Sequence, residues 1–416
     1  MYILFIVTSF WAYGEVTIAC EFAARVRESG YIPYFLIPPS HEKIMNKYKF
    51  TYTTLIPRNG KINRLLMRDL EHRYHPGLVI LADFLNYNFC EVHYGLTPGD
   101  LEVFSGRIGT FDDFDWVITG KQMDTYGFKA AKFGDIDIRK YGFRLCPCPI
   151  VNPNSGYREE TYHYQLTTDT LPYDVYSTDK WKAKLGLPVG KKLILFTSAA
   201  WQESYKQYTD VISFVNANNQ AFYHIMQELT KTYSVVCVGS KGGYSKNSED
   251  GLIFLNQLPP EVFDEYLLAT DLFISRNITA TSLARAVLSG IPSANFENSI
   301  FFSAEKPLDK EKIKFEPAPF VDELLKNLER CYPYRMFPVG WYKFLAPLVK
   351  GNSYMKTFIR LEQFNVIDSI RRIQEVLECE EKREELLKSA DRYKKTLESL
   401  PDVRSIIESL INERRE

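Results

Sequence analysis

The chain has 416 residues, more than one hydrophobic core usually organises, so its length predicts two domains. Hydrophobic residues make up 45% of the sequence, which is enough apolar surface to exclude a disordered protein. The 51 Lys and Arg residues balance the 52 Asp and Glu residues, so no net positive charge favours binding to nucleic acid.

The first predicted elements alternate between strand and helix. Residues 2–7 form an apolar run, residues 16–29 repeat apolar positions with helical spacing, and residues 34–37 form a second apolar run. Apolar runs without polar alternation are typical of parallel strands covered on both faces. This order predicts a doubly wound βαβ unit. Two further strands of the same sheet are expected at 78–82 and 115–119.

A linker and a second α/β unit follow. Residues 146–176 are rich in Pro, Asn, Thr and Tyr and show no helical or alternating period, which is typical of a linker. Strands are predicted beyond it at 192–197, 234–238, 252–255, 272–275 and near Ala294. The chain is therefore expected to form two α/β, Rossmann-like domains with doubly wound parallel sheets facing a cleft. Their predicted limits are 1–150, a linker at 151–180, 181–330, and a helical extension packing across both at 331–416.

Cysteine usage and hydrophobic segments set the expected compartment. Seven cysteines whose one short spacing is Cys146 to Cys148 indicate reduced thiols rather than disulfides or a zinc site. The apolar segment 1–7 has no basic flank, so it is expected to be a strand and not a signal peptide. No apolar stretch reaches the length of about 18 residues that spans a bilayer. We expect a cytoplasmic protein without a transmembrane segment, with contact at the inner membrane face left open.

The segment 271–292 carries the strongest functional signal. A predicted strand ends at Ser275, and Thr279, Thr281 and Ser282 cross a turn into a helix. The free amides and the dipole of such a helix form a site for an anion such as a diphosphate. In the alternative interpretation, Thr281 or Ser282 is simply the N-cap of a structural helix.

This segment resembles the donor-binding βαβ unit of GT-B glycosyltransferases, a superfamily that includes the peptidoglycan GlcNAc transferase and antibiotic glycosyltransferases. Residues 185–202 and 254–259 are similar to the same group, and the N-terminal half resembles it in pattern alone. The resemblance implies metal-independent transfer of a hexose or amino sugar from a UDP- or dTDP-sugar, with inversion expected. It also implies that the first domain binds the acceptor and the second the donor. No cofactor is expected, and the acceptor is left open as a small molecule, a lipid-linked group or a peptide.

The resemblance also implies which residues bind the donor. Two loops would flank the diphosphate with Thr197, Ser198, Ala199, Trp201, Asn277, Thr279, Thr281 and Ser282. Two others would lie along the base with Gly239, Ser240, Gln257 and Leu258. Arg285 stands where many relatives use Glu to hold the ribose hydroxyls. A guanidinium cannot accept a hydrogen bond from a hydroxyl, so either the donor is unusual or the ribose is held elsewhere.

Carboxylates of the first half are the candidate catalytic groups. Glu15 lies in the loop after the first strand, where related enzymes place a catalytic His or Asp. Inverting transfer needs a base to take the acceptor proton, and Asp83 and Asp113 are the other candidates. Alternatively, Glu15 is an ordinary acid in a first helical turn. Trp11 and Tyr13 are candidates for stacking on the acceptor.

One architecture hosts many activities, so two other functions stay open. A nucleotide-sugar 2-epimerase or hydrolase of the same fold would act on the donor alone. A non-catalytic subunit would bind the nucleotide sugar without turning it over. The histidines show no ligand spacing, so no metal site is predicted.

Overall fold

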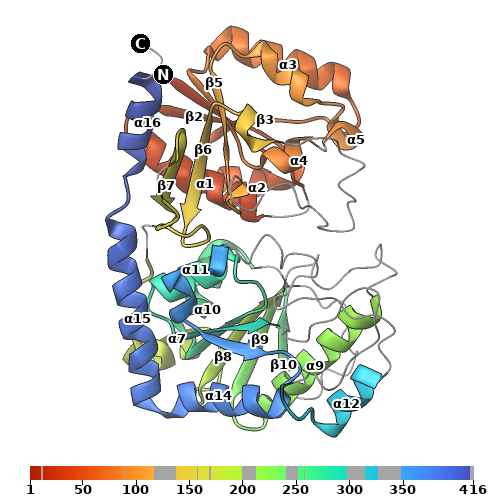
Figure 1. Cartoon of the computed structure of the whole chain (residues 1–416), viewed down its shortest axis with the longest axis vertical. Helices are drawn as coiled ribbons and strands as arrows, with labels where there is room; N and C mark the ends of the chain where they lie inside the picture. Colours follow the sequence, from red (N-terminus) through yellow and green to blue (C-terminus); the bar gives the residue numbers. More distant parts are fainter. Residues whose placement is uncertain are drawn as a thin grey trace.

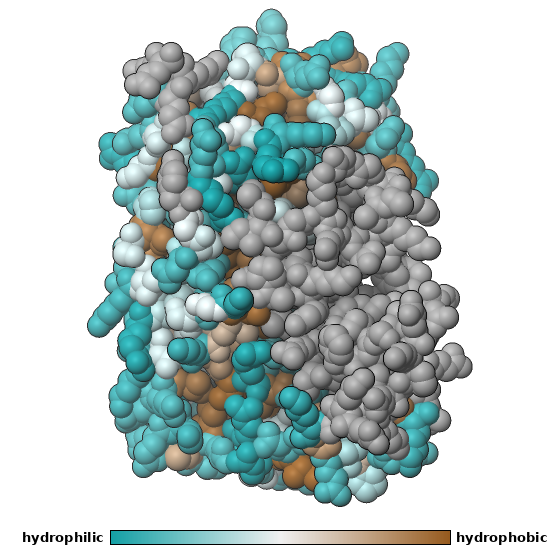
Figure 2. Space-filling model, viewed as in Figure 1, coloured by the Kyte–Doolittle hydropathy of each residue, from teal (hydrophilic) through white to brown (hydrophobic). Residues whose placement is uncertain are grey.

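The computed structural model describes residues 1–10, 13–88, 90–116, 137–156, 158–167, 170–198, 212–239, 252–256, 258–297, 314–326 and 348–412. These residues form two α/β domains stacked one above the other, with two C-terminal helices running along one side of both (Figure 1). On the face shown in Figure 2, hydrophilic side chains cover most of the described surface, and hydrophobic groups appear in separate patches.

The N-terminal domain is built on a seven-stranded parallel sheet with the order β3-β2-β1-β4-β5-β6-β7. Strand β4 is apolar and buried along its whole length, and β1 is buried at every residue but Tyr2, because helices cover both faces of the sheet. The strands are β1 Tyr2–Ile6, β2 Ile32–Ile37, β3 Thr51–Thr54, β4 Leu78–Leu81, β5 Arg107–Phe111, β6 Phe143–Cys148 and β7 Thr161–Gln165. The helices are α1 Gly14–Glu28, α2 Glu42–Tyr48, α3 Gly60–Tyr74, α4 Phe84–Asn88 and α5 Glu91–Tyr94.

The second domain repeats this plan with a six-stranded parallel sheet of order β10-β9-β8-β11-β12-β13. The sheet consists of β8 Leu193–Ser198, β9 Ser234–Gly239, β10 Leu252–Leu255, β11 Leu272–Ser275, β12 Ser293–Glu297 and β13 Ile359–Glu362. Its helices are α7 Thr178–Lys184, α9 Ile212–Thr230, α10 Pro260–Leu268, α11 Thr281–Leu288, α12 Pro319–Lys326 and α14 Val366–Glu378. Two doubly wound parallel sheets are therefore present, as the sequence predicted.

The C-terminal helices return to the first domain. Helix α15, Glu380–Glu398, contacts α11 of the second domain and β7 of the first, and α16, Val403–Asn412, packs on α1. Ile406 and Ile407 of α16 are buried in the core of the N-terminal domain. No helix in the described ranges is long and apolar enough to cross a membrane.

Two segments differ from the sequence-based expectation. Of the strand expected at 115–119, Asp115 and Trp116 lie outside the sheet, after β5, and 117–119 lie outside the described residues. The segment expected to be a linker, 151–180, contains β7, which pairs with β6 as the last strand of the first sheet. The sequence shows no apolar run for β7 because this edge of the sheet is polar. The buried Arg144 guanidinium of β6, for example, donates to the Thr161 hydroxyl of β7 at 3.0 Å.

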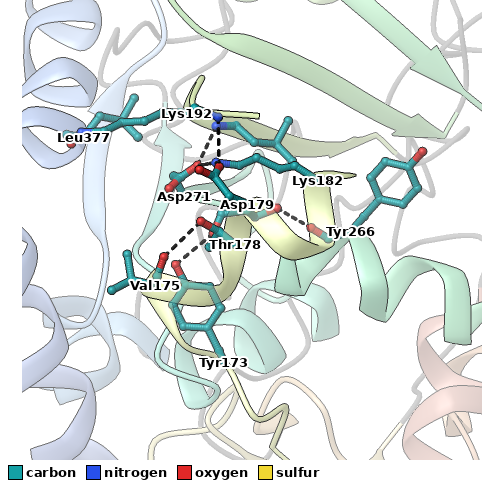
Figure 3. Close-up of polar contacts among 12 residues, drawn as sticks. Tyr173, Val175, Thr178, Asp179, Lys182, Lys192, Tyr266, Asp271 and Leu377 are labelled. Atoms are coloured by element: carbon teal, nitrogen blue, oxygen red, sulfur yellow. Dashed lines mark hydrogen bonds and ion pairs between the residues drawn. The ribbon is translucent and has the colours of Figure 1, made fainter. Parts of the chain in front are cut away.

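A buried ion-pair network fixes the entry into the second domain (Figure 3). Lys182 of α7 is 3% exposed, and its Nζ lies 2.8 Å from Asp271 Oδ2 and 3.1 Å from Asp179 Oδ1. Asp271 Oδ2 also accepts from the backbone amide of Leu193 at 2.7 Å. Because Asp271 precedes β11 and Leu193 begins β8, the network ties α7 to the amino-terminal edge of the sheet.

Candidate active site

A pocket of about 190 Å³ lies between the two domains. Figure 1 shows α2 at the lower edge of the first domain and α11 at the upper edge of the second, on the two sides of this junction. The first domain lines the pocket with Thr17, Glu21, Ile44, Lys47 and Tyr48, and the connection with Leu166 and Thr167. The second domain contributes Leu258, Pro260, Phe263, Asp264, Thr281, Ser282 and Arg285.

The amino terminus of α11 opens into this pocket. The residue at its N-cap position is Ala280, with extended backbone at φ −67° and ψ 125°, and no side chain caps the helix. Thr281 and Ser282, the first two residues of the helix, line the pocket, and in the described part of the chain no side chain of the N-cap residue bonds to their amides. The alternative in which Thr281 or Ser282 is the N-cap is therefore wrong. An uncapped helix amino terminus favours an anion.

The turn before α11 is held by its own side chains. Asn277 Oδ1 accepts from the Thr279 amide at 3.1 Å and from the Thr279 hydroxyl at 2.9 Å. The Ser275 hydroxyl donates to the Asn277 carbonyl at 2.8 Å and accepts from the Asn277 amide at 3.0 Å. Asn277 and Thr279 thus shape the turn that presents the α11 amides.

The other predicted donor residues that the structure describes lie at the carboxyl edge of the second sheet, where α11 begins. Thr197 and Ser198 end β8, which lies between β9 and β11, and Ser198 pairs with Gly239 at the end of β9. Gly239 has φ +133°, and a Cβ there would lie 1.9 Å from the Ser198 carbonyl oxygen. Leu258 lines the pocket. The predicted residues Trp11, Ala199, Trp201, Ser240 and Gln257 lie outside the described residues.

We expect Gly239→Ala to destabilise the second domain by about 1–3 kcal/mol, because the new methyl group meets a backbone carbonyl at a positive φ. Urea unfolding measures the loss. Gly186→Ala is the matched control, since Gly186 has φ +69° but open space where its Cβ would be. An equal loss in the two variants would mean that the close contact with Ser198 costs nothing.

Arg285 is paired inside the pocket. It lies one turn into α11, and its Nη2 donates to Asp264 Oδ2 of α10 at 3.0 Å. Across the pocket, the Tyr48 hydroxyl donates to Glu21 Oε1 at 2.5 Å, and Lys47 Nζ lies 3.8 Å from Glu261 Oε1 of α10. The sequence interpretation missed Asp264 and this α2 wall, because no motif distinguishes them from ordinary charged helix residues.

The structure brings the three candidate catalytic carboxyls together. Glu15 lies in the first turn of α1 after β1, Asp83 follows β4, and Asp113 follows β5. These three strands are neighbours in the sheet, so their carboxyl ends meet at one edge. Asn86 Nδ2 bridges two of the acids, donating to Asp83 Oδ2 at 3.0 Å and to Glu15 Oε1 at 3.5 Å.

Burial keeps these carboxyls protonated up to unusually high pH. Burial, helped by the negative charge of Asp83, raises the pKa of Glu15 to about 7. Burial also raises the pKa of Asp83, and that of Asp113 well above its usual value, with Asp83 and Glu15 adding to the latter. A carboxyl that titrates near neutral pH is suited to general base chemistry.

Hydrogen bonding distinguishes the three acids. Asp83 Oδ1 accepts from the amides of Leu85 and Asn86 at 2.7 and 3.0 Å, so Asp83 caps α4. Glu15 Oε2 and Asp113 Oδ1 are buried and have no hydrogen-bond partner among the described residues. Glu15 and Asp113 therefore retain accepting capacity. Within the described ranges, no three His, Cys, Asp or Glu side chains are grouped so that they could hold a metal ion.

Tyr13 is exposed at the start of α1, two residues before Glu15. It directly precedes α1, its side chain is 40% exposed, and its ring centroid lies 5.0 Å from that of the buried His41. Its hydroxyl donates to the Ser40 carbonyl at 3.4 Å. Tyr13 thus presents a ring surface close to the start of α1.

The chain matches one protein-family model, described as a family of unknown function (DUF6365), over residues 22–414. No curated protein matches it. Among solved structures it is similar to the spinosyn forosaminyltransferase SpnP, with a TM-score of 0.56 and 12% identity over 100% of both chains. It is also similar to Anabaena Alr3699/HepE in complex with UDP-glucose, with a TM-score of 0.55 and 10% identity over 100% of this chain and 99% of that one. For the spinosyn rhamnosyltransferase SpnG the TM-score is 0.53 at 10% identity over 99% of both chains.

These likenesses span both domains and agree with two parallel sheets flanked by helices. They establish the architecture and leave the chemistry to the residues of this chain. The chain has the GT-B fold and belongs to the DUF6365 family.

Proposed function

We propose that the protein is a glycosyltransferase that moves a sugar from a nucleoside diphosphate sugar to an acceptor held by the first domain. One observation carries the proposal. The uncapped amino terminus of α11 opens into a pocket that both domains line. The shared GT-B fold supports it, as do the ligands of two neighbours: UDP-glucose in a HepE structure and thymidine diphosphate in an SpnG structure.

The donor site follows from the charges around α11. A diphosphate at the helix amino terminus would accept hydrogen bonds from the free amides and from the hydroxyls of Thr281 and Ser282. Lys47 and Arg285 line two other walls of the pocket, and each is paired with a carboxylate of α10, Glu261 and Asp264. Negative charge grows on the diphosphate as the sugar bond breaks, so these groups stabilise the transition state more than the ground state. No metal ion enters this mechanism.

Glu15 is the base in this proposal. Its carboxylate takes the proton of an acceptor hydroxyl while that oxygen bonds to the anomeric carbon and the nucleoside diphosphate leaves with the electrons of the broken bond. A pKa of about 7 leaves a large share of the carboxylate ionised at neutral pH. Asp113 is the neighbouring acid with an unpaired oxygen. An epimerase or hydrolase would consume the donor without an acceptor, and we expect no free or isomerised sugar when the protein is incubated with donor alone.

Titration calorimetry with UDP, TDP and GDP tests the donor site, and Ala280→Asp localises it. The new carboxylate would cap α11 and occupy the amides with negative charge. We expect it to lower nucleotide affinity by about tenfold or more while the melting temperature stays level or rises.

Ala280→Gly, which adds neither a cap nor a charge, is the matched control and should keep its affinity within about twofold. Unchanged affinity in Ala280→Asp would place the nucleotide elsewhere. Failure of the unmodified protein to bind any nucleoside diphosphate would remove the proposal.

A further inference from the structure

Helix α3 of the N-terminal domain carries large apolar side chains on its solvent side. Ile62 and Leu65 are 42% and 52% exposed, and Ile56, in the turn before the helix, is 38% exposed. In the described part of the chain, no other helix has two large apolar side chains that are exposed to this degree. A single exposed Leu is ordinary on a protein surface, whereas several that lie close together indicate a surface that another molecule covers.

The packing of α3 explains why these residues face the solvent. Asn63, Met67 and Leu70 are buried and share one face of the helix, at spacings of four and three residues. Asn63 also holds the preceding turn, because its Oδ1 accepts from the Ile56 amide at 2.8 Å and its Nδ2 donates to the Ile56 carbonyl at 2.9 Å. Figure 1 shows α3 at the end of the N-terminal domain that lies away from the second domain.

Cations surround the apolar side chains. The segment 56–75 contains five Lys or Arg residues and two acids, whereas the charges of the whole chain balance. Lys61 precedes Leu65 by four residues and Arg68 follows it by three, so the three lie on one face of α3. Arg58, Lys61 and Arg68 are exposed, and none of them forms an ion pair within the described ranges.

The two acids of this segment do not neutralise those three cations. Asp69 Oδ1 accepts from Arg73 Nε at 2.8 Å, so its charge is already paired on the same helix. The Glu71 side chain is 15% exposed, and its Oε1 accepts from the Ser105 hydroxyl at 2.7 Å. The result is a basic aliphatic surface, which we define by Ile56, Arg58, Lys61, Ile62, Leu65 and Arg68.

The composition of this surface favours one kind of partner. The cores of protein interfaces are enriched in aromatic residues and Met and depleted in Lys, whereas this surface combines Ile and Leu with Lys and Arg. Nucleic acid offers phosphates to the cations but little apolar surface to the aliphatic side chains. At an anionic bilayer, aliphatic side chains enter the boundary of the acyl chains while Lys and Arg lie among the headgroups.

We propose that the basic aliphatic surface binds the protein to the surface of an anionic lipid bilayer. Ile62 and Leu65 enter the acyl boundary, and Lys61 and Arg68 contact the headgroups beside them. The inference does not depend on the proposed function, because none of these residues lines the pocket between the domains.

Sedimentation with lipid vesicles tests the surface. We expect the unmodified protein to bind vesicles that contain phosphatidylglycerol about tenfold or more tightly than vesicles of phosphatidylcholine alone, and added salt to weaken this binding. The double variant Lys61→Glu with Arg68→Glu should bind the anionic vesicles about tenfold or more weakly. Leu65→Ser should weaken binding by about fivefold, because less apolar area enters the bilayer.

Matched variants on other helices control for net charge and apolarity. Lys180→Glu with Lys395→Glu reverses two exposed cations, one on α7 and one on α15. Ile367→Ser removes an aliphatic side chain that is 66% exposed on α14. Both controls should bind within about twofold of the unmodified protein, since charges farther from the bilayer than roughly 8 Å are largely screened at physiological salt. Melting temperatures show whether each variant is folded.

Three results would overturn the inference. One is an unmodified protein that does not bind anionic vesicles, and another is equal binding by the Lys61, Arg68 double variant and its charge control. The third is salt-sensitive binding that Leu65→Ser leaves unchanged, because the aliphatic side chains then do not enter the bilayer. None of these measurements involves a nucleotide, so the proposed function stands or fails separately.

Discussion

Glu15→Gln is expected to lower kcat by about 10²–10⁴-fold and to leave nucleotide affinity within about twofold. The amide keeps the shape of the side chain but cannot take the acceptor proton. Donor binding depends on α11 in the other domain and should not change. Donor consumption in the presence of an acceptor pool measures kcat, and calorimetry measures the affinity.

Two variants make this result specific. Glu28→Gln, in an exposed position at the end of the same helix, should keep full activity. Asp113→Asn tests the neighbouring acid, whose Oδ1 is also unpaired. Normal turnover in Glu15→Gln with loss in Asp113→Asn would transfer the role of base to Asp113. Normal turnover in both would exclude the cluster from the reaction.

The raised pKa of Glu15 also predicts the pH dependence. The base acts when ionised, so kcat/KM should rise as pH rises through about 7 and then level off. Stability should follow the opposite course. The pKa of Glu15 in the folded protein lies above its ordinary value of 4.5. The protonated carboxyl therefore contributes its full stability below pH 4.5, and this contribution is lost as pH rises from 4.5 towards 7. Glu15→Gln should therefore raise the melting temperature at pH 8, and this gain should shrink at pH 5.

Asp271→Asn is expected to cause the largest loss of stability, about 3–5 kcal/mol, because it leaves the buried ammonium of Lys182 without its closest partner. The Leu193 amide also loses a charged acceptor. Guanidinium unfolding followed by circular dichroism measures the change. Nucleotide affinity of the folded variant should be normal, since the network lies at the amino-terminal edge of the sheet and α11 begins at the other.

The partners of this pair supply the controls. Asp179 is 49% exposed, so Asp179→Asn should cost about 1 kcal/mol or less. The double variant Lys182→Met with Asp271→Leu should lose less stability than Asp271→Asn, because it removes both charges and not one. If Asp271→Asn unfolds at the same denaturant concentration as the unmodified protein, the ion pair between Lys182 and Asp271 does not stabilise the fold.

Local signals in the sequence were enough to predict the apolar strands and the ends of several helices. The apolar runs at 2–7 and 234–238 became central parallel strands because a strand buried on both faces needs no polar alternation. The glycines predicted or quoted at helix ends adopt left-handed backbone, with φ +87° at Gly30, +69° at Gly186 and +78° at Gly290. These features depend on neighbours along the chain, so the sequence contains them directly.

Polar edge strands were the exception. Strand β7 carries Tyr, His and Gln side chains, and its place in the sheet depends on pairing with β6. The early position of β5 was missed for a related reason: Arg107 and Thr110 interrupt the apolar run that marks the central strands. Hydrogen bonds to a neighbouring strand stabilise these polar strands, and the order of residues along the chain does not show which strands will be neighbours.

The candidate site was foreseen in its parts but not in its arrangement. The sequence indicated that acids follow β1 and β4 and that small polar residues precede α11. The place of Asp113 after β5 came from the structure, because the strand was expected at 115–119. Strand order decided that Glu15 and Asp113 lie together, and helix packing decided that Asp264 of α10 reaches Arg285 of α11. Domain docking decided that Lys47 and Tyr48 close the pocket. Contacts between residues far apart in the chain follow from the packing of whole elements, and that packing exists in the tertiary structure alone.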